Sequence, residues 1–142
     1  MTSLAKVQAN RRFARLRKGA RRLSARADFE RVRREGRSWS HRLLILVACP
    51  NALDFTRVGV AASKHMGSAV VRNRAKRLMR EAMRQVYPCV RVGWDLLLIA
   101  RVGIVPVKMQ AVAIALESLL RQAELLADRG DPAGSSFQQH AE

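Results

Sequence analysis

The side chains best suited to chemistry in this sequence are cationic, and they lie close together between residues 70 and 86. This stretch, VVRNRAKRLMREAMRQV, holds six Lys or Arg residues and a single Glu. Arginine presents a planar fork of donors that matches the geometry of a phosphate group, and lysine contributes a compact positive charge. The chemistry that such a set favours is the binding of a polyanion through its phosphates.

The spacing of the apolar residues in the same stretch predicts a helix with one face in the core. Apolar side chains recur every three or four residues, which is the period of an amphipathic helix. These residues are Val71, Ala75, Leu78, Met79, Ala82, Met83 and Val86. The neighbouring arc carries Arg72, Asn73, Lys76, Arg77, Arg80 and Arg84, and the far side carries Arg74 and Glu81. A face that was merely solvated would interleave acidic residues with its cations, so a face of one sign indicates a bound partner.

No arrangement typical of an enzyme active site accompanies these cations. Ser63, Lys64 and His65 are adjacent in the sequence, but adjacent side chains rarely converge on one substrate atom. The carboxylates are scattered, and the glycines lack the spacing of a phosphate-binding loop. Cys49 and Cys89 form no CxxC motif and have no histidine at metal-ligand spacing, so we expect both to be small core residues. We expect neither a catalytic residue nor a metal site in the chain.

The basic helix is predicted to be one of six elements in the order α-β-β-α-β-α. The expected strands are residues 42–49, 56–63 and 94–101, and the short linker between the first two favours an antiparallel hairpin. The expected helices besides the basic one are residues 23–36 and 106–127. This order favours a small α+β fold in which a sheet is covered by helices.

Capping residues and one proline are expected to set the helix ends. Ser24 should cap the first helix, and Gly36 should end it. Tyr87-Pro88 should end the basic helix, because proline disfavours helical geometry in the residue before it. The core side of the last helix is expected to hold Val107, Val112, Ile114, Ala115, Leu119 and Leu120.

Charge is distributed unevenly along this chain of 142 residues, whose formal net charge is +16. Such an excess attracts polyanions. Residues 1–20 are basic and free of acidic residues, so we expect a disordered basic extension there, although a mitochondrial targeting peptide has a similar composition. Residues 21–127 are expected to form one folded domain, and residues 128–142 a disordered tail. No apolar run approaches the ~20 residues that span a bilayer, so we expect a cytoplasmic protein with no membrane partner.

Residues 57–84, RVGVAASKHMGSAVVRNRAKRLMREAMR, resemble the bacterial ribonuclease P protein family. Members of this family have a strand with Val-Gly, then Ser-Lys, then a helix that opens with G-[NS]-A-V-x-R-N-R-x-K-R. The segments RLSARADF at 22–29 and DLLLIAR at 95–101 also resemble family segments, and the likeness continues in order through about residues 21–126. An RNR helix preceded by Ser-Lys is far more specific than basic charge alone.

The resemblance implies a protein that acts together with a large RNA. In this family one protein subunit partners one catalytic RNA, and the complex removes the 5′ leader from precursor tRNA. The RNA and bound Mg²⁺ carry out the hydrolysis, so the isolated chain would be inert and would bind no cofactor or small-molecule substrate of its own. The resemblance also implies a left-handed strand-helix-strand crossover around the RNR helix, which is contrary to the usual preference.

The resemblance further implies roles for single residues. Contacts with the catalytic RNA would come from Ser63, Lys64, Arg72, Asn73, Arg74, Lys76, Arg77, Arg80 and Arg84. Phe29 would lie between the first helix and the sheet, where its ring could stack on a base of the single-stranded leader. Two interpretations without RNA contact stay open, in which Asn73 caps or packs locally and Phe29 is a core residue.

The chain departs from the family pattern around the implied leader site. Many relatives have a second aromatic residue four positions after Phe29, where this chain has Arg33. An aromatic residue is also common on the sheet, where this chain has the aliphatic run Leu43 to Val47. Leader binding would then depend on Arg33 and on apolar sheet surface more than on stacking. His65 stands where lysine is frequent, which leaves that loop less charged at neutral pH.

Three alternatives to this family are compatible with a small basic chain. A structural ribosomal protein would share the size and architecture, but it has no need for a Ser-Lys loop and an RNR helix together. A general DNA-binding protein would be expected to dimerise and to bind duplex DNA. A membrane-active helix would carry Trp, Phe and Leu on its apolar face, whereas residues 70–86 carry Val, Ala, Leu and Met, which suit packing in a core.

Overall fold

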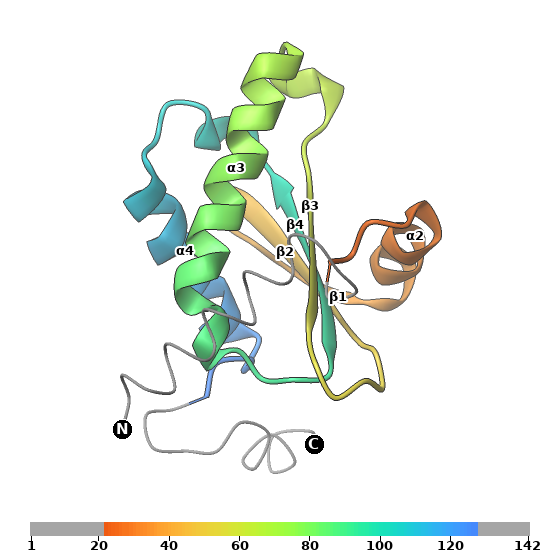
Figure 1. Ribbon diagram of the computed structural model, residues 1–142. Coiled ribbons are helices and arrows are strands. Elements are labelled where there is room, and N and C mark those ends of the chain that lie inside the picture. The colour runs from red at the N-terminus through yellow and green to blue at the C-terminus, as the bar shows by residue number, and fades with distance from the viewer. Residues whose placement is uncertain (1–21, 128–142) are drawn as a thin grey trace.

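The computed structural model describes residues 22–127 and shows a four-stranded mixed sheet with helices on both faces (Figure 1). The elements are α2 (Arg26–Glu35), β1 (Arg37–Ser40), β2 (Leu44–Pro50), β3 (Arg57–Ala61), α3 (Ala69–Val86), β4 (Trp94–Ala100) and α4 (Met109–Gln122). Short 3₁₀ turns lie at Lys64–Met66, Tyr87–Cys89 and Val102–Ile104. The segments predicted to be disordered, 1–20 and 128–142, lie outside the described residues. The α+β class is confirmed, with β1 as an additional strand.

The order of strands in the sheet is β1-β2-β4-β3. β4 pairs antiparallel with β2, where Leu46 faces Leu98, and parallel with β3, where Val60 faces Leu98. The predicted hairpin between residues 42–49 and 56–63 is therefore wrong, because β4 lies between these two strands. β4 is buried along most of its length, and a strand that is apolar on both faces belongs in the middle of a covered sheet.

The β3-α3-β4 unit is the crossover that carries the basic helix. Because β3 and β4 are parallel neighbours, the chain must cross the sheet between them, and α3 forms this crossing. The left-handed sense that the resemblance implies stays a prediction. The connection places the first turns of α3 at the end of the sheet where β3 and β4 finish.

Alternating side chains of the strands build two cores on opposite faces of the sheet. α3 and α4 cover the face with the larger core, to which the strands contribute Leu44, Leu46, Ala48, Val58, Val60, Leu96, Leu98 and Ala100. α2 lies on the opposite side of the sheet from α3 and α4 (Figure 1). The smaller core on that side consists of Leu23, Val32, Val47, Cys49 and Leu97. Because this second core is small, α2 is attached to the sheet by few apolar contacts.

Three expectations about single residues are wrong. Ser24 does not cap α2, since the N-cap is Ala25, which makes no side-chain hydrogen bond. Ile114 is 71% exposed, because α4 is apolar on more than one face and the periodicity alone does not single out its core side. Cys89 is exposed at the end of the 3₁₀ turn after α3, whereas Cys49 is buried as predicted.

Candidate nucleic-acid interface

The basic face predicted for residues 70–86 is present on α3. The helix begins after Ser68, whose hydroxyl accepts a hydrogen bond from the backbone N–H of Val71. Its core side buries Ala75, Met79, Ala82 and Met83. Next to this core side, Arg72, Lys76, Arg80 and Arg84 are half-buried, and Asn73, Arg74 and Arg77 are exposed. Half-buried Lys and Arg side chains typically lay their aliphatic stems along the protein surface and keep the charged group in water.

Arg80 and Arg72 lie in surroundings that favour an incoming anion. Burial lowers the pKa of the Arg80 guanidinium, and repulsion from Arg22 lowers it further. The Nε atom of Arg72 is buried, and within the described part of the chain it has no hydrogen-bond partner. A phosphate group at this face would offset the repulsion and accept a hydrogen bond from the buried N–H.

Among residues 22–127, Arg74 and Arg84 each have a hydrogen-bond or ion-pair partner. Arg74 donates from Nη1 to the carbonyl oxygen of Val105 at 2.7 Å and from Nη2 to that of Val107 at 3.1 Å. Arg84 forms an ion pair with Glu81 at 3.7 Å. Arg74 was predicted to lie on the side of the helix away from the basic arc. Its structural role there is to tie α3 to the segment before α4.

The loop that leads into α3 places Ser63 and Lys64 at the surface. Lys64 begins a 3₁₀ turn that ends at Gly67. Gly67 has a φ of +132°, a conformation that residues with a side chain rarely adopt. The glycine therefore lets the chain turn sharply, so that Ser63 and Lys64 lie next to the first turn of α3.

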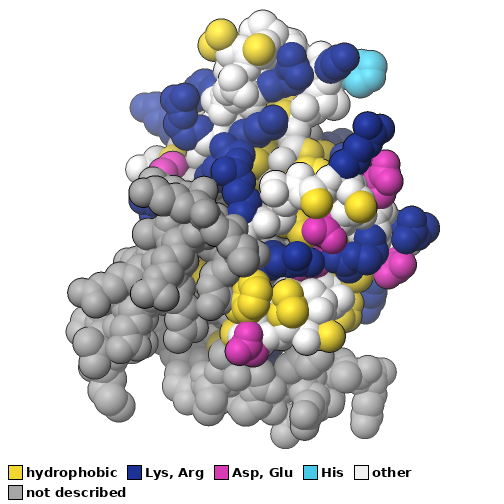
Figure 2. Space-filling model, turned by 45° about the vertical axis from the view of Figure 1, so that its right-hand side comes forward, with side chains coloured by type: hydrophobic (Ala, Val, Ile, Leu, Met, Phe, Trp, Pro, Cys, Tyr) yellow, Lys and Arg dark blue, Asp and Glu magenta, His cyan; other side chains and the backbone are white. Residues whose placement is uncertain are grey.

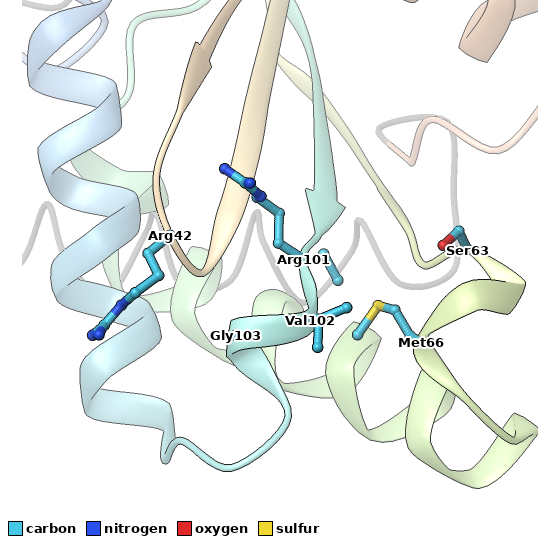
Figure 3. A pocket seen from close by; sticks show the side chains of 7 residues that line it. Arg42, Ser63, Met66, Arg101, Val102 and Gly103 are labelled. Carbon is cyan, nitrogen blue, oxygen red and sulfur yellow. The ribbon is translucent and has the colours of Figure 1, made fainter.

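A cavity of about 430 Å³ opens beside this loop, at the end of the sheet where β3 and β4 finish (Figure 3). It is lined by Arg42, Ser63, Met66, Ala100, Arg101, Val102 and Gly103. The side chain of Met66 points toward Val102, which is 64% exposed, so this part of the cavity is apolar. Of these residues, Ser63 is among the contacts predicted from the sequence, whereas Arg42 and Arg101 are not. Their position just before and just after buried strands was the signal that could have identified them.

Phe29 lies between α2 and the sheet. A methyl group built on Gly59 of β3 would come within 2.9 Å of ring carbon Cε1 of Phe29, so the ring rests directly on the glycine. Arg33, one turn further along α2, is exposed. Several apolar residues that pack on the smaller core keep part of their surface accessible. They are Phe29, Ile45, Ala61 and Ile99, and we call them the open sheet face.

Charged side chains over the face seen in Figure 2 are mostly Lys and Arg, and they extend from the end of the molecule where α3 begins to the middle of the view. Asp and Glu appear there only singly. Within residues 22–127, no three His, Cys, Asp or Glu side chains lie together in a way that could hold a metal ion. Across the same described residues, no helix combines the length and the apolar character needed to cross a membrane.

Similar sequences and similar folds are found among ribonuclease P proteins. The family model described as Ribonuclease P matches residues 17–124. The ribonuclease P protein component of Herpetosiphon aurantiacus is 43% identical over 113 residues, which cover 80% of this chain and 92% of that relative. The component of Dehalococcoides mccartyi is 36% identical over 118 residues, which cover 83% of this chain and 97% of that relative. The match to the solved structure of the Staphylococcus aureus RNase P protein covers 76% of this chain and 99% of that protein, with a TM-score of 0.68 and 31% identity. The match to the Thermotoga maritima RNase P protein covers 72% of this chain and 97% of that protein, with a TM-score of 0.66 and 28% identity.

Proposed function

Because the chain belongs to the bacterial ribonuclease P protein family, we propose that it binds the catalytic RNA of ribonuclease P and the 5′ leader of precursor tRNA. In that complex it promotes endonucleolytic removal of the leader, which generates the mature 5′ end of the tRNA. The observation that supports this most directly is the face of one charge sign on α3, because it coincides with the RNR segment of the family. Such a face suits recognition of RNA by shape, through phosphates and 2′-hydroxyls.

The catalytic RNA is the proposed ligand of α3 and of the loop before it. Arg72, Lys76 and Arg80 are spaced four residues apart, which is a rise of about 6 Å along a helix, so the row can meet neighbouring phosphates of a strand. Asn73 is exposed beside this row, and its amide can both donate to and accept from a 2′-hydroxyl. Ser63 and Lys64 extend the same surface. Arg77 adds an exposed cation, whereas Arg74 and Arg84 contribute mainly charge because both already have protein partners.

The 5′ leader is the proposed ligand of the open sheet face. This face offers one aromatic ring, Phe29, next to aliphatic surface, and Arg33, exposed one turn further along α2, is the proposed cation for the leader backbone. Single-stranded RNA is commonly held by a stacked base combined with phosphate contacts. The cavity between Arg42 and Arg101 provides further positive charge at the end of the same sheet.

Hydrolysis is proposed to belong to the RNA and its Mg²⁺ ions, so that the isolated chain is inert. Mg²⁺ prefers oxygen ligands, and phosphate oxygens are common among them in phosphoryl chemistry, so the RNA can supply ligands for the ion. One protein chain per RNA, a cytoplasmic location and no small-molecule substrate are the corresponding expectations.

Phe29→Ala is expected to weaken binding of precursor tRNA to the reconstituted complex by about five- to 150-fold, the worth of one stacked base. Binding of mature tRNA should not change, because mature tRNA has no leader. The dissociation constants of both tRNAs, measured with the same preparation, test this.

The matched control is Phe29→Leu, which retains apolar contact with Gly59 but cannot stack a base in the same way. If stacking matters, Phe29→Leu should lose precursor binding while keeping the thermal stability of the wild type. An equal loss for precursor and mature tRNA in Phe29→Ala would show that Phe29 serves only to pack α2 on the sheet.

A further inference from the structure

The side of the sheet that faces α2 carries a buried carboxylate. Asp95, the second residue of β4, is 0% exposed, and it is the one buried Asp or Glu among residues 22–127. Strand pairing sets Cys49 of β2 on one side of it and Arg57 of β3 on the other. A buried carboxylate destabilises a protein unless several donors surround it, so its partners show which elements it connects.

Three donors from three different segments bind Asp95. Arg57 of β3 donates from Nε to Oδ1 at 2.8 Å and from Nη2 to Oδ2 at 2.6 Å, which is a bidentate pair. Asn51, in the loop after β2, donates from Nδ2 to Oδ1 at 2.9 Å, and Arg31 of α2 donates from Nη2 to Oδ2. Asp28 completes the network, with carboxylate oxygens 3.7 Å from Arg31 and from Arg57. Asp95, itself on β4, thus joins α2 to β3 and to the loop after β2.

The link to Asp95 adds a directional contact to the apolar packing of α2. The helix has a single buried side chain, Val32, in the smaller core. Apolar burial is non-directional, so it permits small rotations and shifts, whereas a hydrogen bond between guanidinium and carboxylate has a narrow preferred geometry. Arg31 stands between Phe29 and Arg33 along α2. The link therefore acts on the turn of the helix that carries both proposed leader contacts.

We propose that Asp95 is the positioning residue of the leader site: through Arg31 it holds α2 at the height and angle over the sheet at which Phe29 and Arg33 meet the leader. Asp95 touches no RNA, because its side chain is buried. It acts on the preference of the complex for precursor over mature tRNA. This inference rests on the proposed function, since the preference exists only if the leader binds on this side of the sheet.

Because Asp95 is negatively charged, the positioning role and simple electrostatics predict opposite effects of its replacement on leader binding. Asp95→Asn removes a negative charge from a protein that binds a polyanion, so electrostatics alone would leave RNA binding unchanged or tighten it. Asparagine retains the shape of the side chain, but its NH₂ group is a donor that cannot accept from Arg31 or Arg57. Loss of positioning would therefore weaken leader binding despite the more favourable charge.

The experiment measures the dissociation constant of mature tRNA divided by that of precursor tRNA, in complexes reconstituted with the catalytic RNA. Asp95→Asn is expected to lower the ratio of the two constants by at least about fivefold, the lower bound for a stacked base. Its affinity for the catalytic RNA and for mature tRNA should stay within about twofold of the wild type. Arg34→Gln is the matched control on the same helix, because Arg34 is exposed and pairs only with the adjacent Glu35 at 3.2 Å in the described structure. It should leave the ratio unchanged.

A second variant keeps the test decisive if Asp95→Asn is not folded at the assay temperature. Arg31→Gln leaves the bidentate pair of Arg57 and Asp95 in place, and it should lower the ratio by a similar factor. The slope of log Kd for precursor tRNA against log salt should change equally in Arg31→Gln and Asp95→Asn, because both act only through the position of Phe29 and Arg33. A slope that is reduced by about one contact more in Arg31→Gln than in Asp95→Asn would assign Arg31 to direct leader binding and overturn the proposal.

The outcomes separate the positioning role from the proposed function. A ratio that is unchanged or increased in folded Asp95→Asn, with catalytic RNA binding intact, would overturn the proposal and leave Asp95 as a residue that only stabilises the fold. A wild-type complex that does not prefer precursor tRNA would instead overturn leader binding itself.

Discussion

Replacing Arg72, Lys76 and Arg80 together with glutamine is expected to weaken binding of the catalytic RNA by roughly 100- to 1,000-fold. The three side chains form one row on α3, and each is expected to contribute about a tenfold factor, or about 1.4 kcal/mol, as a charge-assisted contact with phosphate. Glutamine has a good helix propensity, so α3 should remain folded. The dissociation constant of the catalytic RNA, measured over a series of salt concentrations, tests this expectation.

Salt dependence and a matched triple variant separate specific contacts from net charge. The slope of log K against log salt should become shallower by about two to three in the α3 variant, because each phosphate contact contributes roughly 0.7 to 0.9. Glutamine at Arg34, Arg37 and Arg121 removes the same charge from exposed positions outside α3, and it should weaken binding only slightly. Equal losses in the two triple variants would show that affinity follows net charge and that α3 has no special role.

Asp95→Ala is expected to lower the free energy of unfolding by about 3 kcal/mol, at the lower end of what breaking a buried ion pair costs. The lower end applies because the side chains of Arg31 and Arg57 are 28% and 21% exposed, so both can regain some water. Urea denaturation at neutral pH measures the change. A loss below about 1 kcal/mol, the level of an ordinary exposed pair, would contradict this account of the network.

The same carboxylate should make stability depend on pH in the acid range. Burial by itself would raise the pKa of Asp95, but the hydrogen bonds from Arg57, Asn51 and Arg31 outweigh it and hold this pKa below its ordinary value. The stabilisation is then complete above the unfolded-state pKa of about 3.9 and is lost as the pH falls through the lower folded-state pKa. The difference in unfolding free energy between the wild type and Asp95→Asn should therefore shrink below about pH 4. Parallel stability curves down to the acid limit would contradict a lowered pKa.

α3 could be predicted from the sequence because everything that defines it is local. The three-and-four spacing sets its core side, and the cations on the adjacent arc need no partner elsewhere to be recognised. In α4 the same spacing wrongly placed Ile114 in the core, although this residue is exposed. In that helix several faces are apolar, so the spacing does not say which face meets the sheet.

The sheet was harder to predict because strand pairing is not local. A short linker favoured a hairpin between the strands that became β2 and β3, but the strongly apolar β4 pairs with both of them. β1 was missed because its sequence, RSWS, is short and largely polar. It forms through backbone pairing with β2 at the edge of the sheet.

The parts of the candidate site formed by one local segment were predicted from the sequence, and the parts formed by distant segments were not. The Ser63-Lys64 loop and the α3 face were found because they form one continuous segment. The network around Asp95 was not found, because Arg31 lies 64 residues from Asp95 and Arg57 lies 38 residues from it. A carboxylate near the start of an otherwise apolar strand was the available sign that buried donors would surround it.

The most direct measurement is a cleavage assay in which the purified chain, a bacterial ribonuclease P RNA and a precursor tRNA are combined at low, near-physiological Mg²⁺. RNA alone and protein alone are the controls. The account predicts that the chain restores correct cleavage at the 5′ end, that it is inert by itself, and that the triple variant of α3 loses this effect. A chain that binds the RNA without increasing cleavage would contradict the account and favour a ribosomal or general nucleic-acid-binding role.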